Sequence, residues 1–214
     1  MTEEDRFTKS IFDNALKVIR DPAAFFRQMP REGGFGAPVI FLAAMVFLGL
    51  IVNLIGAALI IRPHNIGGGL IMLIAAPVIM VLLSFVSAAV LFLIWRIIGS
   101  KQSYETAYRC MAYSCGILPV TSAISFIPFA GVVLSTLWGA YLIISASIHV
   151  HGIKPAKAWA VWGIIAVIFI GINLSAEMGS RYAARNMVRQ RLEMQKLQDN
   201  AVKEMQKAKK EMYK

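Results

Sequence analysis

Two histidines one residue apart are the side chains of this sequence whose type and spacing most suggest chemistry. His149 and His151 stand in the stretch ASIHVHGIKPAKAW, directly after a long apolar run. Neutral imidazole is a frequent ligand of zinc, which takes four protein ligands, or three and a water. No Cys, Asp or Glu stands near the pair, and the third histidine, His64, lies in a distant loop. On a helix, residues two apart also point about 200° apart. We therefore expect no metal site here, but a helix end that faces water or lipid headgroups.

Other candidate chemistry is sparse. The HExxH pattern of metalloproteases and the aspartates of a GxGD pair are absent, and Ser114 lacks the GxSxG frame of a nucleophile. Cys110 and Cys115 are five residues apart, about 140° around a helix, and we interpret them as small packing residues. The basic residues occur without an RNA- or DNA-binding motif. The sequence therefore predicts no catalytic residue, no cofactor, no enzyme activity and no nucleic-acid partner.

The composition indicates a membrane protein. Of the 214 residues, 57% are hydrophobic and only 16% are charged, whereas a soluble domain is about half apolar and about a quarter charged. A helix needs about 20 mostly apolar residues to cross a bilayer core. We predict an all-α, polytopic bundle of five transmembrane helices, at residues 38–61, 70–95, 106–126, 129–149 and 158–176.

The third and fourth predicted spans come from one apolar run. Residues 110–150 would form a helix of roughly 62 Å, about twice the thickness of the bilayer core. Pro128 and Gly131 interrupt the helical pattern near the middle of the run. We therefore expect the chain to turn there and to cross twice.

The two ends of the chain differ from this membrane domain. Residues 1–37 have no apolar signal-peptide core and contain an amphipathic helical pattern that stops at Asp21-Pro22. The following PAAFFRQM is either an interfacial helix at the headgroups or a short helix packed on the spans. Residues 177–214 form a predicted helical tail with ten of the 22 Lys and Arg residues.

A weak heptad stripe runs along this tail. Met187, Met194, Ala201 and Ala208 recur every seven residues, which is a weaker signal than Leu or Ile heptads. The tail is therefore either a solvated helix or a self-association element.

Three tyrosines and two prolines are the candidate intramembrane contact residues. Tyr104, Tyr108, Tyr113 and Pro119 fall in or beside the third span, and Pro77 lies inside the second. A proline removes a backbone hydrogen bond, and a tyrosine hydroxyl inside a bilayer needs a partner. We expect these tyrosines and Pro119 to line one face or kink of the third span, and Pro77 to kink the second.

Four stretches in a fixed order resemble the YIP family, the Ypt/Rab-interacting membrane-domain proteins. The order is Asp21-Pro22 with Phe25-Phe26, then AYSCGILP at 112–119, then IPFAGVVLSTLWGAYLI, then HVHGIKPAKA before the last span. The resemblance covers roughly residues 15–178. Its family-motif positions include Asp21 and Pro22, and also His151, Lys157 and Ala158 in the last stretch.

The resemblance implies a fold and a class of function. The fold is five membrane helices with a cytoplasmic N-terminus, and eukaryotic members bind Rab GTPases and associate with relatives. Those members carry a long cytosolic region with an acidic Tyr-Gly-Pro motif, which this sequence lacks. The short N-terminus is similar to bacterial members, which implies a multi-pass protein of the bacterial inner membrane.

Two functions from different classes follow. The first is a non-enzymatic membrane scaffold whose partners are the lipid bilayer and itself or other membrane proteins. The second is a transporter or channel, which would keep ionisable groups near the bilayer midplane. The predicted spans hold Asn53 and Asn173 there, but no Asp, Glu, Lys or Arg. The sequence favours the scaffold.

The distribution of basic residues indicates the membrane topology. The loops and the C-terminal tail, however, give conflicting indications. Five spans with an internal N-terminus place these basic residues inside, as the positive-inside rule requires: Arg96, Lys101, Arg109, Lys154 and Lys157. The same arrangement sends the basic tail to the outside. The outside loops then hold only Arg62. Re-entrant folding of residues 110–150 as one net crossing would bring the tail inside, but it would export Lys154 and Lys157. We expect five full crossings because the 110–150 run is long enough for two of them.

Overall fold

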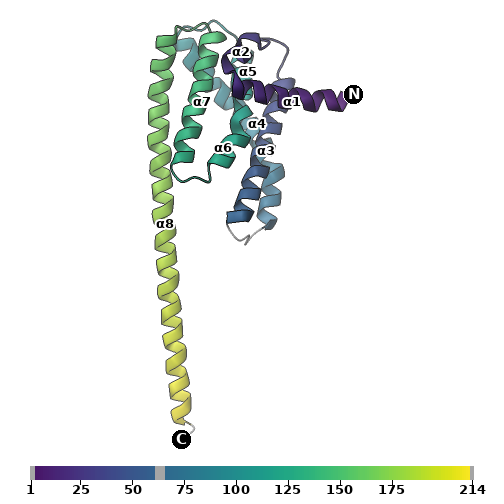
Figure 1. The fold of residues 1–214 in the computed structure, drawn as a ribbon. Coiled ribbons are helices and arrows are strands. Elements are labelled where there is room, and N and C mark those ends of the chain that lie inside the picture. Colours follow the sequence, from purple (N-terminus) through teal and green to yellow (C-terminus); the bar gives the residue numbers. More distant parts are fainter. Residues whose placement is uncertain (1–2, 61–65, 213–214) are drawn as a thin grey trace. The chain divides into compact units, whose positions relative to one another are not determined.

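The computed structural model describes residues 3–60 and 66–212, and the side-chain surroundings of residues 10–56, 58, 59, 75–200, 203 and 205 (Figure 1). His64, which was considered above as a ligand, lies outside the described residues. Every regular element in the described part is a helix. The chain divides into two compact units, one ending at Ile170 and one beginning at Gly171.

The helices follow the predicted order. The first four are α1 (Glu3–Arg20), α2 (Pro22–Gln28), α3 (Gly36–Ile60) and α4 (Ile66–Ile97). They are followed by α5 (Tyr104–Ser114), the 3₁₀ helix η1 (Cys115–Ile117), α6 (Leu118–Ile124), α7 (Ala130–His149) and α8 (Pro155–Met212). The helix α4 starts four residues before the predicted span, because Ile66 and the three glycines that follow it are helical instead of forming a turn.

Four stretches of the described helices are long and apolar enough to cross a membrane. They are Gly36–Gly56, Ala75–Ile97, Ala130–His149 and a stretch of α8 within Pro155–Asn200. Large apolar side chains are exposed along these helices; on α4, Leu82 and Val86 are 66% and 62% exposed. A water-soluble protein rarely leaves such continuous apolar faces uncovered, whereas lipid tails cover them. The prediction of an all-helical membrane bundle is confirmed.

The third predicted span, 106–126, is not one continuous helix. It is divided into α5, η1 and α6, and the break falls at Cys115–Ile117. Pro119 explains the break, because it has no N–H to donate to the Cys115 carbonyl four residues earlier. The Leu118 N–H donates to that carbonyl instead, which tightens the turn to 3₁₀ geometry. The three segments together still lead from one end of the bundle toward the other (Figure 1).

The break provides the surface on which α1 packs. In the first unit, α1 lies crosswise to α3 and contacts α2, α5 and η1 (Figure 1). Ala15 and Val18 of α1 are buried. A Cβ placed on Gly116 would lie 3.5 Å from the Ala15 Cα and 3.2 Å from the Phe41 ring. Gly116 therefore lets the α1 backbone approach η1 closely.

The buried core lies mainly at the end of the bundle where α1 and α2 pack. The largest cluster joins side chains of α1, α2, α3, α5, η1 and α7 with the end of α4 and the start of α8. A second cluster joins α3, α4 and α5 around Leu42, Ala88 and Tyr108. Because α5 contributes to both clusters, it connects the α1–α2 pair to the membrane helices.

The close approach at Gly116 predicts the effect of a larger side chain. Gly116→Leu should destabilise the protein by about 1–3 kcal/mol, because the new side chain overpacks against Ala15 and Phe41. Hydrogen exchange of the α1 amides should rise, and the detergent-solubilised protein should unfold at a lower temperature.

Gly163→Leu is the matched control, because a Cβ at Gly163 meets nothing within 4 Å. Unchanged α1 protection in the Gly116 variant would show that the contact does not hold α1 in place.

Candidate functional site

Three segments that are far apart in sequence meet at one end of the bundle. The Arg27 Nε donates to His149 Nδ1 at 3.3 Å, and the Gly34 N–H donates to Glu105 Oε1 at 2.7 Å. We call this region, formed by residues 27–35, 96–109 and 149–157, the basic end. Its basic side chains are Arg27, Arg31, Arg96, Lys101, Arg109, Lys154 and Lys157. The structure thus gathers the residues that the charge argument placed on one side of the membrane.

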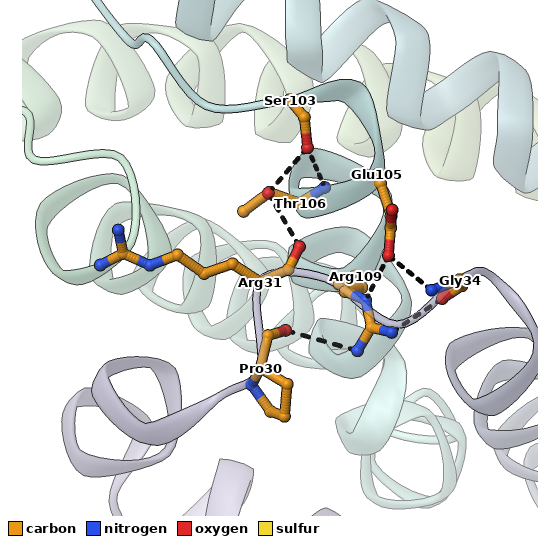
Figure 2. A network of polar contacts seen from close by, with 7 residues as sticks. All are labelled: Pro30, Arg31, Gly34, Ser103, Glu105, Thr106 and Arg109. Carbon is orange, nitrogen blue, oxygen red and sulfur yellow. Dashed lines mark hydrogen bonds and ion pairs between the residues drawn. The ribbon is translucent and has the colours of Figure 1, made fainter.

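Arg109 holds the chain between α2 and α3 (Figure 2). Its side chain is 4% exposed. The guanidinium Nη2 donates to the Gly34 carbonyl at 2.8 Å, and Nη1 donates to the Pro30 carbonyl at 3.3 Å. Its Nε forms an ion pair with Glu105 Oε1 at 3.3 Å. A planar guanidinium can make such divergent contacts at once, whereas a lysine ammonium is a compact point charge.

A second set of hydrogen bonds holds the same loop beside Arg109 (Figure 2). Thr106 Oγ1 donates to the Arg31 carbonyl at 3.0 Å. Ser103 caps α5, because its Oγ accepts from the Thr106 N–H at 3.2 Å. The loop itself bends through Gly33, whose φ of 120° disfavours other residues, and a Cβ there would lie 2.9 Å from the Arg109 guanidinium. The loop is therefore fixed by its backbone carbonyls.

A groove of about 640 Å³ lies between α1 and α2. It forms because Asp21 separates the two helices: its Oδ1 accepts from the Ala24 N–H at 2.9 Å, and Pro22 occupies the first position of α2. The lining residues are Asp13, Asn14, Leu16, Lys17, Arg20, Asp21, Ala24, Phe25, Gln28, Met29, Pro30 and Tyr113. This volume is in the range of small-molecule sites in proteins.

Tyr113 lines this groove and connects two of the family-like stretches. Its ring centroid lies 5.3 Å from that of Phe25 and 5.0 Å from that of Phe41. The residue is 8% exposed, and no hydrogen bond joins its hydroxyl to another residue in the described part of the chain. Phe26 is buried beside it in the core. Asp21-Pro22-x-x-Phe-Phe and AYSCGILP thus form one contact surface.

The other two candidate tyrosines face a different helix. The Tyr104 hydroxyl donates to the Phe85 carbonyl at 2.7 Å, and the Tyr108 hydroxyl lies 3.0 Å from Ser84 Oγ. Both rings also contact Phe35. Tyr104 and Tyr108 lie on α5 and both contact α4. Tyr113, on the same helix, does not share these contacts. We propose that their hydroxyls fasten α5 to α4.

The two candidate prolines lie in different settings. Pro119 is at the start of α6, just after the break in the third span. Pro77 lies inside α4, which remains helical on both sides of it, and it is partly exposed. No described contact ties Pro77 to the basic end, so its predicted kink stays a prediction.

His151 belongs to a buried aromatic cluster. Its ring stacks on Trp95 at 3.9 Å between centroids, and its Nδ1 lies 2.7 Å from Ser100 Oγ. Ser147 Oγ accepts from the indole N–H groups of Trp95 and Trp162, at 2.7 and 2.8 Å. The cluster therefore joins α4, α7 and α8. Its position contradicts the expectation that both histidines face water or headgroups, because His151 is only 6% exposed.

The remaining family-motif positions begin α8. Ala158 is fully buried, and its N–H donates to the Lys154 carbonyl at 3.0 Å, whereas Lys157 is exposed. A small residue at Ala158 lets the first turn of α8 pack on the core, and Lys157 points its charge toward solvent or headgroups.

Sequence reasoning missed several of these residues. Arg109 was interpreted only as one of the basic residues on the inner side of the membrane, and Trp95, Ser147 and Trp162 were not singled out. One signal was available for Arg109, because a glutamate precedes it by four residues and a Gly-Gly pair follows Pro30. No three His, Cys, Asp or Glu residues in the described part of the chain are placed to hold a metal ion.

The Arg109 contacts predict a selective effect of a conservative change. Arg109→Lys should destabilise the protein by about 2 kcal/mol or more, because the ammonium cannot reach both carbonyls and leaves a buried acceptor without a partner. Amide exchange at residues 33–35 should increase most.

Arg185→Lys on the exposed tail is the matched control and should change neither quantity. Equal protection of the 33–35 amides in wild type and Arg109→Lys would contradict the clamp.

His151 predicts an acid-dependent loss of stability. Burial, and secondarily the positive charge of Arg31, lowers the pKa of His151 from 6.5 to about 4. Between these values the unfolded chain binds a proton that the folded chain does not. The contribution of His151 to the free energy of unfolding is therefore complete above pH 6.5 and is lost as the pH falls through 4. The loss has a limit of roughly 3 kcal/mol.

Thermal unfolding between pH 7 and pH 4 measures this effect. His151→Gln should lose this part of the acid dependence, whereas His149→Gln should keep it. An unchanged pH profile in the His151 variant would assign the acid sensitivity to other groups.

The comparisons with known proteins agree with the sequence resemblance. The chain matches the family model described as the Yip1 domain over residues 16–176. No curated protein and no solved structure gives a significant match. The matched region contains α2 to α7, the break in the third span and the first membrane-crossing part of α8. This match covers more than half of the sequence, and the chain therefore belongs to the Yip1 domain family.

Proposed function

We propose that this chain is a non-enzymatic integral membrane scaffold that presents its basic end to other membrane components. This proposal rests on one observation: buried polar side chains of the basic end are bound to other groups of the same region. Arg109 is paired with Glu105 and two loop carbonyls, and His151 is paired with Ser100. Such a surface is preorganised for contact, because its loops are already ordered before a partner arrives.

The pairing of these groups also supports a non-enzymatic role. A catalytic acid or base must reach a substrate in a cleft with a tuned pKa. Glu105 instead accepts from the Gly34 N–H and Arg109, and His151 is stacked beneath Trp95. These side chains therefore hold the fold together.

The transporter alternative has less support. Transporters place ionisable side chains or broken helices around a site near the bilayer midplane. The groove of about 640 Å³ lies between α1 and α2, outside the four candidate spans. A cavity between α6 and α7, lined in part by Leu134 and Trp138, measures about 10 Å³, which is about the size of one water molecule. The break at η1 is filled by α1 and Phe41.

We further infer that the membrane is the bacterial inner membrane, with the basic end in the cytoplasm. Support comes from the positive-inside rule, because seven basic residues of the first unit belong to that end, whereas the turn at 125–129 carries no charge and the 61–65 connection carries only Arg62.

Cross-linking in native membranes tests the scaffold. A photo-reactive amino acid in place of Lys101 or Lys154, both exposed at the basic end, should give discrete protein adducts that mass spectrometry identifies. The same residue in place of Leu82, on the exposed apolar face of α4, is the control and should capture lipid. Only lipid adducts at all three positions would count against a protein partner.

Cysteine labelling tests the orientation. In intact spheroplasts, a membrane-impermeant maleimide should label Ser125→Cys in the α6–α7 turn but not Lys101→Cys, and wild type with its two native cysteines sets the background. The five-crossing prediction adds that a reporter fused after Lys214 is inactive if it functions only in the cytoplasm. Labelling of Lys101→Cys from outside would reverse the orientation.

A further inference from the structure

The groove between α1 and α2 carries charges of both signs that are not used to hold the fold. Asp13, Lys17 and Arg20 lie at positions i, i+4 and i+7 of α1, and so share one face of the helix. Asp21 faces them from the start of α2, and only its Oδ1 is bound, to the Ala24 N–H. No ion pair joins these four side chains to one another in the described part of the chain. They are available to a ligand.

Tyr113 forms part of the floor of the groove, and its position is fixed by packing. Tyr113 is more than nine-tenths buried and lines the groove, and its hydroxyl has no hydrogen-bond partner among the described residues. Its ring is fixed between Phe25 and Phe41. Because Tyr113 lines the groove, its hydroxyl can donate a hydrogen bond to a ligand there.

An exposed apolar strip of α1 borders the groove. Phe12 and Leu16, one helical turn apart on α1, are 49% and 45% exposed. Ala15, between them, packs on Gly116 and near Phe41, which is five residues into the first candidate span. Figure 1 shows α1 lying crosswise to α3, near the end of the bundle where α2 lies. A helix beside the start of a membrane span is suited to the headgroup region.

We propose that the groove binds the headgroup of a membrane phospholipid that carries both a phosphate and a primary ammonium. Lys17, Arg20 and the Tyr113 hydroxyl bind the phosphate oxygens. Asp13 and the free oxygen of Asp21 accept hydrogen bonds from the ammonium. The acyl chains leave along Leu16 and Phe12 toward the bilayer.

The charge pattern selects among headgroups. A purely anionic lipid satisfies Lys17 and Arg20 but leaves two carboxylates facing negative charge. A choline headgroup balances the charge, but its trimethylammonium has no N–H to donate, whereas a primary ammonium has three. Phosphatidylethanolamine is therefore preferred over phosphatidylglycerol and phosphatidylcholine.

Native mass spectrometry of the full-length protein in detergent tests this site. With phosphatidylethanolamine, phosphatidylcholine and phosphatidylglycerol added singly, wild type should retain one phosphatidylethanolamine, on the order of tenfold more tightly than phosphatidylglycerol. Equal or tighter binding of phosphatidylglycerol to wild type would overturn the proposal without any variant.

Variants assign the two halves of the site. Lys17→Ala should weaken phosphatidylethanolamine binding by about five- to tenfold, and Tyr113→Phe by a few-fold, because each removes one phosphate contact. Asp13→Asn should reduce the preference over phosphatidylglycerol. Lys154→Ala is the matched control, since it removes an equally exposed charge at the basic end outside the groove. Wild-type affinity in Lys17→Ala would contradict the assignment.

Two further measurements keep the test decisive. Added phosphatidylethanolamine should raise the unfolding temperature of wild type and Lys154→Ala more than that of Lys17→Ala. Water-soluble glycerophosphoethanolamine should compete only weakly, because it lacks the acyl chains that contact Leu16 and Phe12. Competition at concentrations equal to the lipid would show that the groove binds a free phosphoester and would overturn the lipid assignment.

Discussion

The buried guanidinium of Arg109 is the interaction on which the basic end depends. An isolated charge at 4% exposure would be strongly unfavourable. It is compensated by Glu105 and by the carbonyls of Pro30 and Gly34. Because those carbonyls belong to the connection between α2 and α3, the charge can be buried only when this connection is folded against α5. The position of α2 above the membrane helices follows from this requirement.

The break in the third span has an equally direct consequence. An unbroken helix would present side chains on every turn, whereas η1 presents Gly116 to α1. The proline that causes the break and the glycine that uses it belong to the same stretch, AYSCGILP. An irregular backbone at this depth is tolerated because protein covers it. The stretch therefore serves as a docking surface for α1 and α2.

The two polar clusters of the basic end rely on different physics. Around Arg109, an ionic group binds backbone oxygens, which fixes a loop. Around His151, a neutral ring stacks on Trp95, and one serine hydroxyl accepts from two indoles, which joins three helices. Both clusters lie near the ends of membrane helices, where amphipathic aromatic side chains are favoured because one part of them is apolar and another is polar.

The sequence by itself determined the helical membrane class, the order of the helices and the family. Apolar run length decides what can cross a bilayer, and Pro128 with Gly131 correctly marked the turn before α7. The sequence also indicated the basic residues that share one end. It indicated a kink near Pro119, but it did not show that Gly116 at this break accommodates α1, or that Tyr113 separates from Tyr104 and Tyr108. Nor did it show that His151 is buried. These features depend on which side chains from distant segments fill the same space, and only tertiary packing decides that.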